Sequence, residues 1–302
     1  MNLVIEPGSL TGFIGPNGAG KTTTIRMIMS IIFPDSVRLS VLGRASAVES
    51  KDRIGYLPEE RGLYKKMRVG AFLVYAARLK GVAERGLDAL VRQWIDRVEL
   101  GDVYRKRCEE LSKGMQQKVQ FIASVIHQPD LVILDEPFSG LDPVNSRLLR
   151  RLIDEQHSAG RTIIFSTHQM SQAEALCDRV VMIHQGRKVL DDSPRAIKSS
   201  HDPRAIALEP IGAFDPASIR HIPEIAGVTA DNAVVRIDLR DGVDAVDLIP
   251  RLAQSVRVRR IEVMQPTLED VFVNIVQGVS GGDAATLREA LHSPVRSEAG
   301  GD

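Results

Sequence analysis

The sequence predicts an α/β protein with an open, mostly parallel sheet, an inserted helical block and a small α+β domain towards the C-terminus. Between residues 10 and 185, short apolar runs alternate with helical segments, which is typical of a parallel sheet covered by helices. Between residues 69 and 107, apolar residues recur at three- and four-residue steps instead. Beyond about residue 204, two strand-like runs and two helical segments form a separate group.

The first part of this pattern covers residues 10–134, from one apolar strand to another. The expected elements are, in order, a strand at 10–14, a helix at 21–32, strands at 37–42 and 54–57, a helical block at 69–107, a helix at 112–127 and a strand at 131–134. The hydroxyl of Ser112 can cap its helix, and Pro129 cannot continue it. The continuous run Leu131–Leu134 is typical of a strand buried in a parallel sheet.

The second part continues the alternation and then loosens. We expect a helix starting at Asp142 and Pro143, a strand at 162–166, a helix opened by a capping box at 171–174, a strand at 179–183, a linker at 194–204, a strand at 234–239, a helix at 243–254, a strand at 258–263 and a helix capped by Thr267. Glycine, serine, alanine and charged residues dominate from Gly278 onward, which predicts disorder. The expected boundaries are 1–198, with a helical subdomain at about 64–130, then 199–277, and a tail at 278–302.

The composition excludes several classes of protein. With 39 basic and 39 acidic residues there is no overall positive field, so we expect no nucleic-acid partner. Cys108 and Cys177 lie far apart, which indicates reduced thiols rather than a disulfide framework or a metal cluster. The longest strongly apolar segment, Met27–Pro34, is far shorter than the roughly 20 residues of a membrane helix. No signal-peptide pattern precedes it, so we expect a cytoplasmic protein.

The strongest motif is the glycine-rich turn between the first strand and the first helix. It reads Gly15-Pro16-Asn17-Gly18-Ala19-Gly20-Lys21-Thr22 and matches the phosphate-loop (Walker A) pattern in the strand-to-helix context that this motif requires. Its glycines let backbone N–H groups turn towards phosphate oxygens, while the helix N-terminus and Lys21 add positive potential. We expect the Thr22 hydroxyl to bind Mg²⁺ and Thr23 to join the nucleotide site, so ATP and Mg²⁺ are the expected cofactors.

Two adjacent carboxylates end the apolar strand at 131–134. Asp135 and Glu136 would lie at the sheet edge where α/β proteins bind nucleotides. Asp135 is expected to hold Mg²⁺, directly or through water. Glu136 is expected to act as general base on the attacking water. An apolar run followed by Asp-Glu is by itself an ordinary strand end, and only the upstream phosphate loop favours the catalytic interpretation.

Three further segments separate this chain from other phosphate-loop proteins. Leu111–Gln117 (Leu-Ser-Lys-Gly-Met-Gln-Gln) resembles the signature sequence of ABC-type ATPases, and Ser139-Gly140-Leu141-Asp142 resembles their D-loop. His168 resembles the switch histidine, although alone it would be a surface or capping residue. Together with the phosphate loop and the Asp135 strand, five motifs stand in the order of that family. The chain therefore resembles an ABC transporter ATP-binding subunit over about residues 8–198.

The resemblance implies a catalytic cycle in a dimer. Ser112, Lys113, Gly114 and Met115 would cover ATP held by the phosphate loop of a second copy, or of a related ATPase subunit, because a helix N-terminus favours an anion. Hydrolysis would then drive a separate membrane permease. The segment from Arg61 to Arg107 would form the surface that binds the cytoplasmic coupling helices of that permease. The protein would lie on the inner face of the cell membrane through that permease.

Two strings resemble one subgroup of the family, the bacterial efflux systems for sodium ions or drugs. The first is Ile54–Tyr64 (Ile-Gly-Tyr-Leu-Pro-Glu-Glu-Arg-Gly-Leu-Tyr), and the second is Pro266–Phe272 (Pro-Thr-Leu-Glu-Asp-Val-Phe). The second string resembles the accessory C-terminal domain of that subgroup. This resemblance implies transport out of the cell.

The chain departs from the family pattern in three places. Glu59 stands where many members have the Q-loop glutamine, and Lys113 and Met115 replace the commoner residues of the signature, which we interpret as markers of the subgroup. Family members usually have a strand and an aromatic residue some way upstream of the phosphate loop that stacks on adenine, whereas only fourteen residues precede Gly15 here. We expect either a start site further upstream or weaker ATP binding.

Two other functions remain open at this point. Glu59 and the short N-terminal segment are compatible with a nucleotide-binding regulatory module of low turnover. An ABC protein that acts on ribosomes or DNA is a weaker alternative, because the chain has one phosphate loop, no long coiled-coil insertion and no net positive charge.

Overall fold

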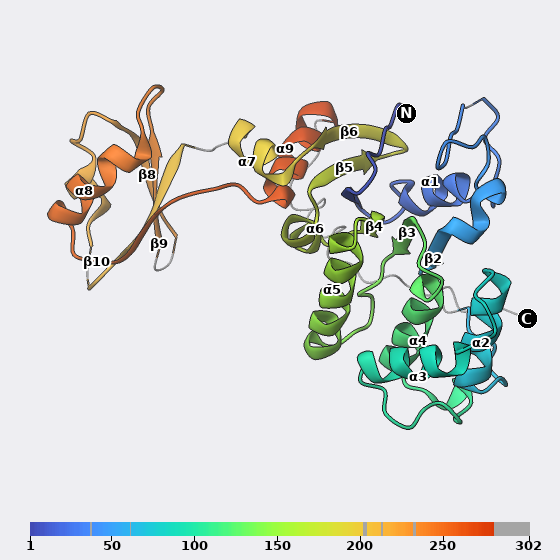
Figure 1. The fold of residues 1–302 in the computed structure, drawn as a ribbon. Coiled ribbons are helices and arrows are strands. Elements are labelled where there is room, and N and C mark those ends of the chain that lie inside the picture. Colours follow the sequence, from blue (N-terminus) through green and yellow to red (C-terminus); the bar gives the residue numbers. More distant parts are fainter. Residues whose placement is uncertain (37, 61, 202–203, 213, 232–233, 281–302) are drawn as a thin grey trace, which may run out of the picture. The chain divides into compact units, whose positions relative to one another are not determined.

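The computed structural model describes residues 1–36, 38–60, 62–201, 204–212, 214–231 and 234–280 (Figure 1). The chain forms two compact units, and the first changes to the second between Ser193 and Pro194. The boundary expected at residue 198 falls inside helix α7 (Pro194–Ser200), so the segment expected to be a linker begins as a helix.

The first unit is built on a six-stranded sheet with the order β2-β3-β4-β1-β5-β6. Its strands are β1 (Leu10–Ile14), β2 (Ile54–Leu57), β3 (Leu131–Asp135), β4 (Thr162–Thr167), β5 (Arg179–His184) and β6 (Arg187–Asp192). The first five are parallel, and only β6 pairs antiparallel, with β5. The parallel α/β sheet predicted from the sequence is therefore confirmed, and the hairpin to β6 is an addition to it.

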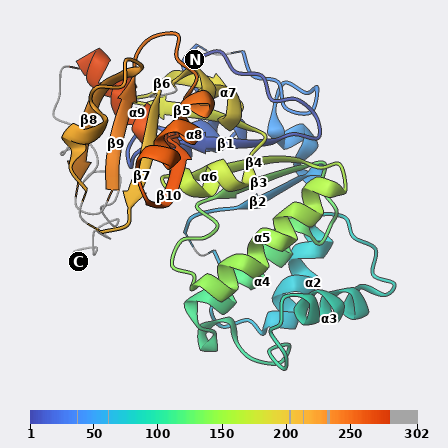
Figure 2. The same ribbon diagram turned by 90° about the vertical axis from the view of Figure 1, so that its left-hand side faces the viewer.

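Helices cover this sheet and extend one side of it. They are α1 (Lys21–Ile28), α2 (Val69–Leu79), α3 (Leu87–Arg97), α4 (Lys113–Val125), α5 (Pro143–Ser158) and α6 (Met170–Leu176), with short 3-10 helices at Ala47–Arg53 and Cys108–Glu110. α2, α3 and α4 pack against one another as the inserted helical block (Figures 1 and 2). On β1, Phe13 packs in the cluster that contains α1, whereas Gly12 faces Ala173 of α6. Since neighbouring strand residues point to opposite faces, α1 and α6 cover opposite faces of the sheet.

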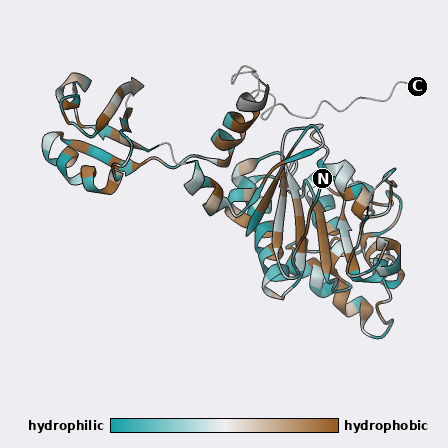
Figure 3. Ribbon diagram, turned by 90° about the horizontal axis from the view of Figure 1, so that it is seen from above, coloured by the Kyte–Doolittle hydropathy of each residue, from teal (hydrophilic) through white to brown (hydrophobic). Residues whose placement is uncertain are grey.

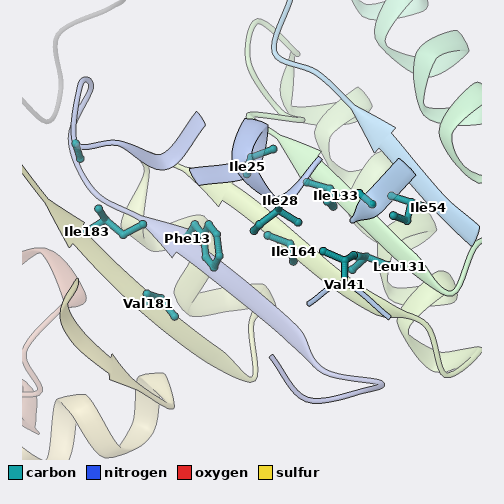
Figure 4. Close-up of a cluster of buried hydrophobic side chains, with 12 residues drawn as sticks. Phe13, Ile25, Ile28, Val41, Ile54, Leu131, Ile133, Ile164, Val181 and Ile183 are labelled. Atoms are coloured by element: carbon teal, nitrogen blue, oxygen red, sulfur yellow. The ribbon is translucent and has the colours of Figure 1, made fainter. Parts of the chain in front are cut away.

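The core next to the phosphate loop is a cluster of aliphatic side chains around Phe13. Ile25 and Ile28 of α1 lie in one cluster with side chains from five strands, β1 to β5 (Figure 4). The strands of this sheet are rich in the hydrophobic residues drawn in brown in Figure 3. Burying one such large side chain stabilises the fold by roughly 1.5–3 kcal/mol. The packing therefore fixes α1, and with it the first helical turn after the glycine-rich loop.

The second unit is a four-stranded antiparallel sheet with one covering helix. The strand order is β10-β7-β9-β8. The elements are β7 (Ala205–Pro210), β8 (Ile225–Asp231), β9 (Val234–Leu239), α8 (Ala245–Ser255), β10 (Val258–Val263) and α9 (Leu268–Ser280), with a 3-10 helix at Pro216–Ile219. Leu248 and Leu252 of α8 pack on Ile206, Ile237 and other strand residues to form the core of this unit. The prediction of a small α+β domain is confirmed, and β7 and β8 were not predicted.

Two elements of the first unit are shorter than the sequence predicts. The helix predicted to reach Ile32 stops at Ile28, because Ser30 adopts a positive φ of 55° and the chain turns away. In the strand predicted at 37–42, the described residues form only an isolated bridge between Val41 and Arg44. Leu42 and Gly43 both have positive φ, so a tight turn replaces the strand.

Two predictions about helix termini also differ from the structure. The capping box predicted at Ser171–Glu174 is wrong, because α6 already starts at Met170 and Gln169 is its N-cap residue. At the C-terminal side the helix capped by Thr267 is confirmed, since the Thr267 hydroxyl accepts the Asp270 N–H at 3.1 Å. That helix continues to Ser280, beyond the start of the tail expected at Gly278, and residues 281–302 lie outside the described part of the chain.

Within the described residues, no helix combines the length and the apolar character that crossing a bilayer requires.

Candidate functional site

The glycine-rich turn follows β1, in the middle of the sheet, and leads directly into α1. Gly15 has φ 149°, and a Cβ atom there would lie 2.1 Å from the carbonyl oxygen of Ile183 on β5, so a larger residue cannot occupy this position. The Lys21 side chain is only 6% exposed, and its Nζ donates to the carbonyl oxygens of Gly15 (2.8 Å) and Pro16 (3.1 Å). Burial lowers the pKa of this ammonium group, and the carboxylates of Glu136 and Asp135 oppose that shift.

The other residues predicted for the phosphate site lie on the same loop and first helical turn: Asn17, Gly18, Ala19, Gly20, Thr22 and Thr23. Asn17, Gly18 and Thr23 are exposed, whereas the Ala19 side chain is buried in the core. Their contact with a nucleotide stays a prediction. The loop and the following helix supply the backbone donors that a phosphate group requires.

Asp135 ends β3 next to the phosphate loop and is completely buried. Its Oδ1 accepts hydrogen bonds from the hydroxyl groups of Ser166 and Thr22, the latter at 3.4 Å. Its Oδ2 is buried and has no partner among the described residues. Burial raises the pKa of Asp135, because the charged form loses its hydration. A carboxylate oxygen without a partner and a nearby threonine hydroxyl are hard oxygen donors of the kind that suits Mg²⁺, so these residues fit the expected metal.

Glu136 follows at once, and its backbone has φ 47°, a left-handed conformation that is uncommon for glutamate. Its side chain is 9% exposed and forms a hydrogen-bonded pair with His168. Oε1 accepts the backbone N–H of His168 at 2.8 Å and lies 2.9 Å from His168 Nδ1, and Oε2 accepts the hydroxyl of Thr167 at 3.4 Å. The hydrogen bond to Glu136 raises the pKa of His168. The carboxylate is thus oriented from one side, as a positioned general base must be.

Glu59 lies just beyond β2 and is exposed at the same edge of the sheet. Partial burial raises its pKa, and the negative charges of Asp135 and Glu136 add to the shift. Lys21 and His168 act in the opposite direction. Electrostatically, Glu59 therefore belongs to the group formed by the lysine, the histidine and the two carboxylates, as a third carboxylate.

The signature residues are in a different place, at the N-terminal tip of α4. Ser112 is the N-cap residue, exposed to solvent, and its Oγ accepts the N–H of Met115 at 3.3 Å. Lys113 is also exposed. Among the residues that the structure describes, no hydrogen bond or ion pair joins residues 112–115 to Lys21, Asp135 or Glu136. The structure thus separates the predicted site into a phosphate-loop part and a signature part.

The signature part lies beside the segment predicted to be the D-loop and is hydrogen-bonded to the residue that follows Glu136. A Cβ atom on Gly114 would lie 3.5 Å from both Leu141 and Asn145, which is ordinary contact distance. Gln117 of α4 donates from Nε2 to the carbonyl oxygen of Pro137 at 2.9 Å, one residue after Glu136. Asp142 caps α5 by accepting the N–H groups of Val144 and Asn145, each at 2.9 Å.

Replacing Asp142 with alanine should lower the thermal stability of the protein. The helix would lose the acceptor for two backbone N–H groups, which we expect to lower the melting temperature by about 2–4 °C. The measurement is thermal unfolding followed by circular dichroism. Asp154→Ala, an exposed position within the same helix, is the matched control and should melt within about 1 °C of wild type. Equal melting temperatures for Asp142→Ala and the control would contradict the capping role.

Three positioning residues were not predicted from the sequence. Ser166 and Thr167, at the carboxyl end of β4, hold Asp135 and Glu136, and Gln117 holds the segment that follows them. The only sequence signal is that two hydroxyl residues end an apolar strand, which is common at strand ends. The register that places Ser166 opposite Asp135 belongs to the assembled sheet.

A phosphate loop between a central parallel strand and a helix, with an aspartate and a glutamate at the carboxyl end of another strand of the same sheet, defines a P-loop nucleoside triphosphatase. The comparisons with known proteins agree with this class. A model of the ABC transporter family matches residues 1–139, and a model described as the C-terminal domain of DrrA1-3-like ATP-binding proteins matches residues 193–276.

Individual ATP-binding proteins of ABC transporters are similar to this chain over most of its length. An uncharacterized ABC transporter ATP-binding protein of Alkalihalophilus pseudofirmus is 41% identical over 263 residues, 87% of this chain and 98% of that protein. The Nod factor export ATP-binding protein I of Burkholderia pseudomallei is 30% identical over 275 residues, 90% of this chain and 89% of that protein. A solved ATP-binding subunit of an ABC transporter is 30% identical with a TM-score of 0.61 and covers 66% of this chain and 84% of that one.

The chain belongs to the ATP-binding proteins of ABC transporters, ATPases whose hydrolysis is coupled to transport. The resemblance to the subgroup with an accessory C-terminal domain is confirmed as well. Proteins of this family bind nucleotide and work with a membrane permease component.

Proposed function

We propose that two copies of this chain bind two MgATP molecules between them and use hydrolysis to drive a separate membrane permease that exports its substrate. The work would take place at the cytoplasmic face of the cell membrane. The DrrA-like C-terminal domain and the export function named for the Burkholderia relative support the direction of transport. The inserted helical block would receive the permease.

The chemistry follows from the geometry of the phosphate-loop part. Lys21 lies against the carbonyl groups of its own loop and would turn to the β- and γ-phosphate oxygens of ATP. Thr22 and Asp135 would hold Mg²⁺, which neutralises phosphate charge when bound. Glu136, held by His168 and Thr167, would take a proton from the attacking water, and His168 would stabilise the carboxylate in the orientation that this requires.

The observation that carries the dimer is the exposed tip of α4. Ser112 and Lys113 face solvent at the N-terminus of a 13-residue helix, with no bond to the phosphate-loop part within the described residues. A helix N-terminus is a ready anion site, and an exposed one can cover the γ-phosphate held by a second copy. Loss of that phosphate would then loosen the pair and give the permease two states to follow.

A mixing experiment tests this arrangement. Lys21→Met disables the phosphate loop of one copy, and Gly114→Asp places a negative charge where the signature would meet the γ-phosphate. The new Cβ at residue 114 has room, so the second variant should fold. Each variant alone should release little phosphate from ATP. Mixed together they form dimers with one intact composite site, and phosphate release should recover to a substantial fraction of one wild-type site.

A matched mixture controls for contamination and for simple addition of activities. Lys21→Met mixed with Glu136→Gln has both defects on the phosphate-loop side, so no intact composite site can form and no recovery is expected. Absence of recovery in the first mixture, with wild type active, would refute the shared site. Negligible turnover by wild type itself would favour the regulatory module, for which the third carboxylate at Glu59 is the supporting feature.

A further inference from the structure

One part of the helical block is strongly basic, although the chain as a whole has no net charge. Between Tyr64 and Arg107 the sequence contains eleven basic and five acidic residues, whereas the whole chain has 39 of each. Concentrated positive charge at the surface attracts anions locally even when the net charge is zero.

The fold brings two basic segments of this region side by side. Residues 65–68 read Lys-Lys-Met-Arg, and residues 105–107 read Arg-Lys-Arg. They pair in antiparallel fashion: Val69 N–H donates to Lys106 O and Cys108 N–H to Met67 O, both at 2.9 Å, and an isolated bridge joins Arg68 to Arg107. Six cations from two segments thus lie on one exposed edge of the helical block.

A cavity opens beside this edge, between α2 and α3, which lie side by side in Figures 1 and 2. Its volume is about 520 Å³, within the range of small-molecule sites. Four arginines from three segments line it: Arg68 at the N-cap of α2, Arg78 in α2, Arg92 in α3 and Arg105 in the loop that follows α3. Two acidic residues, Glu84 and Asp88, also line it. The charged lining therefore has an excess of two positive charges.

One wall of the cavity is formed by Tyr104 and the side chains in contact with it. The ring of Tyr104 packs on Gly70 so closely that a Cβ atom there would lie 2.4 Å from it. The guanidinium group of Arg92 stacks on this ring with Cζ 3.8 Å from the centroid, and its Nε donates to Asp88 at 2.8 Å. The Tyr104 hydroxyl also donates to Asp88. Arg92 thus lies flat on the ring and donates to Asp88 through Nε, so its planar guanidinium group presents its terminal N–H groups in a fixed orientation.

Two of the arginines have no acidic partner. Within the described ranges, the side chains of Arg68 and Arg105 make no hydrogen bond or ion pair, whereas Arg78 pairs with Glu84. Both unpaired side chains are exposed and line the same cavity as Arg92. One ligand that carries several anionic oxygens can form ion pairs and hydrogen bonds with all of these cations, although they come from different segments.

We propose that this cavity binds a phosphate group, either the headgroup of an anionic phospholipid or a soluble phosphate ester. A phosphate presents three or four oxygens in three dimensions to converging arginine forks, whereas a carboxylate offers two oxygens in one plane. None of the lining residues belongs to the phosphate loop, to the signature or to the Asp135–Glu136 pair. The inference goes beyond the ATPase function and stands independently of the dimer.

The test compares the full-length wild type with the double variant Arg68→Gln/Arg105→Gln. One arm measures binding of glycerol 3-phosphate by calorimetry, and the other measures cosedimentation with vesicles of phosphatidylcholine that contain phosphatidylglycerol. The double variant should bind its ligand about tenfold more weakly or worse. Binding in the calorimetric arm identifies a soluble ester, and binding to the vesicles alone identifies a headgroup. Any contribution of the phosphate loop is common to both proteins and cancels in the comparison.

Two further variants make the test specific. Arg236→Gln/Arg259→Gln, on the antiparallel sheet of the second unit, removes the same charge elsewhere and should bind like wild type. Arg92→Lys keeps the charge but removes the planar fork, and it should also weaken binding. The proposal is overturned if wild type binds neither probe, if the control pair loses as much affinity as Arg68→Gln/Arg105→Gln, or if Arg92→Lys binds unchanged. ATP hydrolysis should persist in every variant, so this failure is distinguishable from failure of the proposed function.

Discussion

Replacing Glu136 with glutamine is expected to lower the rate of ATP hydrolysis by about two to four orders of magnitude, with ATP binding retained. The amide cannot accept a proton from water, but it has nearly the same shape as the carboxylate, and its oxygen can still accept the His168 N–H. Steady-state phosphate release and equilibrium ATP binding measure the two effects separately. Because hydrolysis no longer removes the bridging phosphate, an ATP-dependent dimer should accumulate in size-exclusion chromatography with light scattering.

The control for this prediction is Glu49→Gln. Glu49 is an exposed glutamate of the 3-10 helix at Ala47–Arg53, and the same change of one charge there should leave hydrolysis within about twofold of wild type. If Glu136→Gln keeps more than about a tenth of the wild-type rate, Glu136 is not the general base. If its rate falls but it remains monomeric at saturating ATP, the base assignment stands and the sandwich dimer does not.

The second large effect is expected for Lys21→Met, which should weaken ATP binding by about ten- to a hundredfold. A charged hydrogen bond to phosphate contributes roughly 1.5–3 kcal/mol, and methionine retains the bulk of the side chain without the charge. Without nucleotide the fold should be little affected, because the ammonium group is desolvated and, among the described residues, bonds only to two carbonyl oxygens of its own loop. A thermal shift assay checks both points at once.

In that assay, wild type should melt at a higher temperature with ATP than without it, and Lys21→Met should lose most of this increase. Lys51→Met is the control, since the exposed Lys51 side chain lies outside the phosphate loop. It should retain the full ATP-dependent increase. An undiminished increase in Lys21→Met would show that the lysine does not contact the nucleotide.

Local sequence patterns were sufficient to locate the phosphate-loop part. Gly15–Thr22 is contiguous, and each step of its chemistry follows from residue types that are adjacent in the chain. Asp135 and Glu136 end an apolar run, and parallel strands place their carboxyl ends at one edge, so their proximity to the loop could also be predicted. By contrast, the residue types around His168 do not indicate that it pairs with Glu136, and only the family resemblance pointed to a role for this histidine.

Other features depend on partners that are distant in the chain. Ser166 holds Asp135 because β3 and β4 pair in one register, and the two basic segments at 65–68 and 105–107 meet because the fold closes the helical block on itself. The same applies to β7 and β8, whose short runs become strands only when β9 lies between them. The capping box at Ser171 failed because α6 begins one residue earlier, at Met170.

The sequence by itself determined the parallel α/β class, the phosphate loop, the acidic pair and the place of the signature before its helix. The tertiary structure alone decided which oxygen of Asp135 stays without a partner, how Glu136 is oriented and where unpaired arginines converge. The physical reason is range: backbone conformation and apolar periodicity are set by near neighbours in the chain. Hydrogen-bond satisfaction and local charge depend on side chains that only the packed fold brings within a few ångströms.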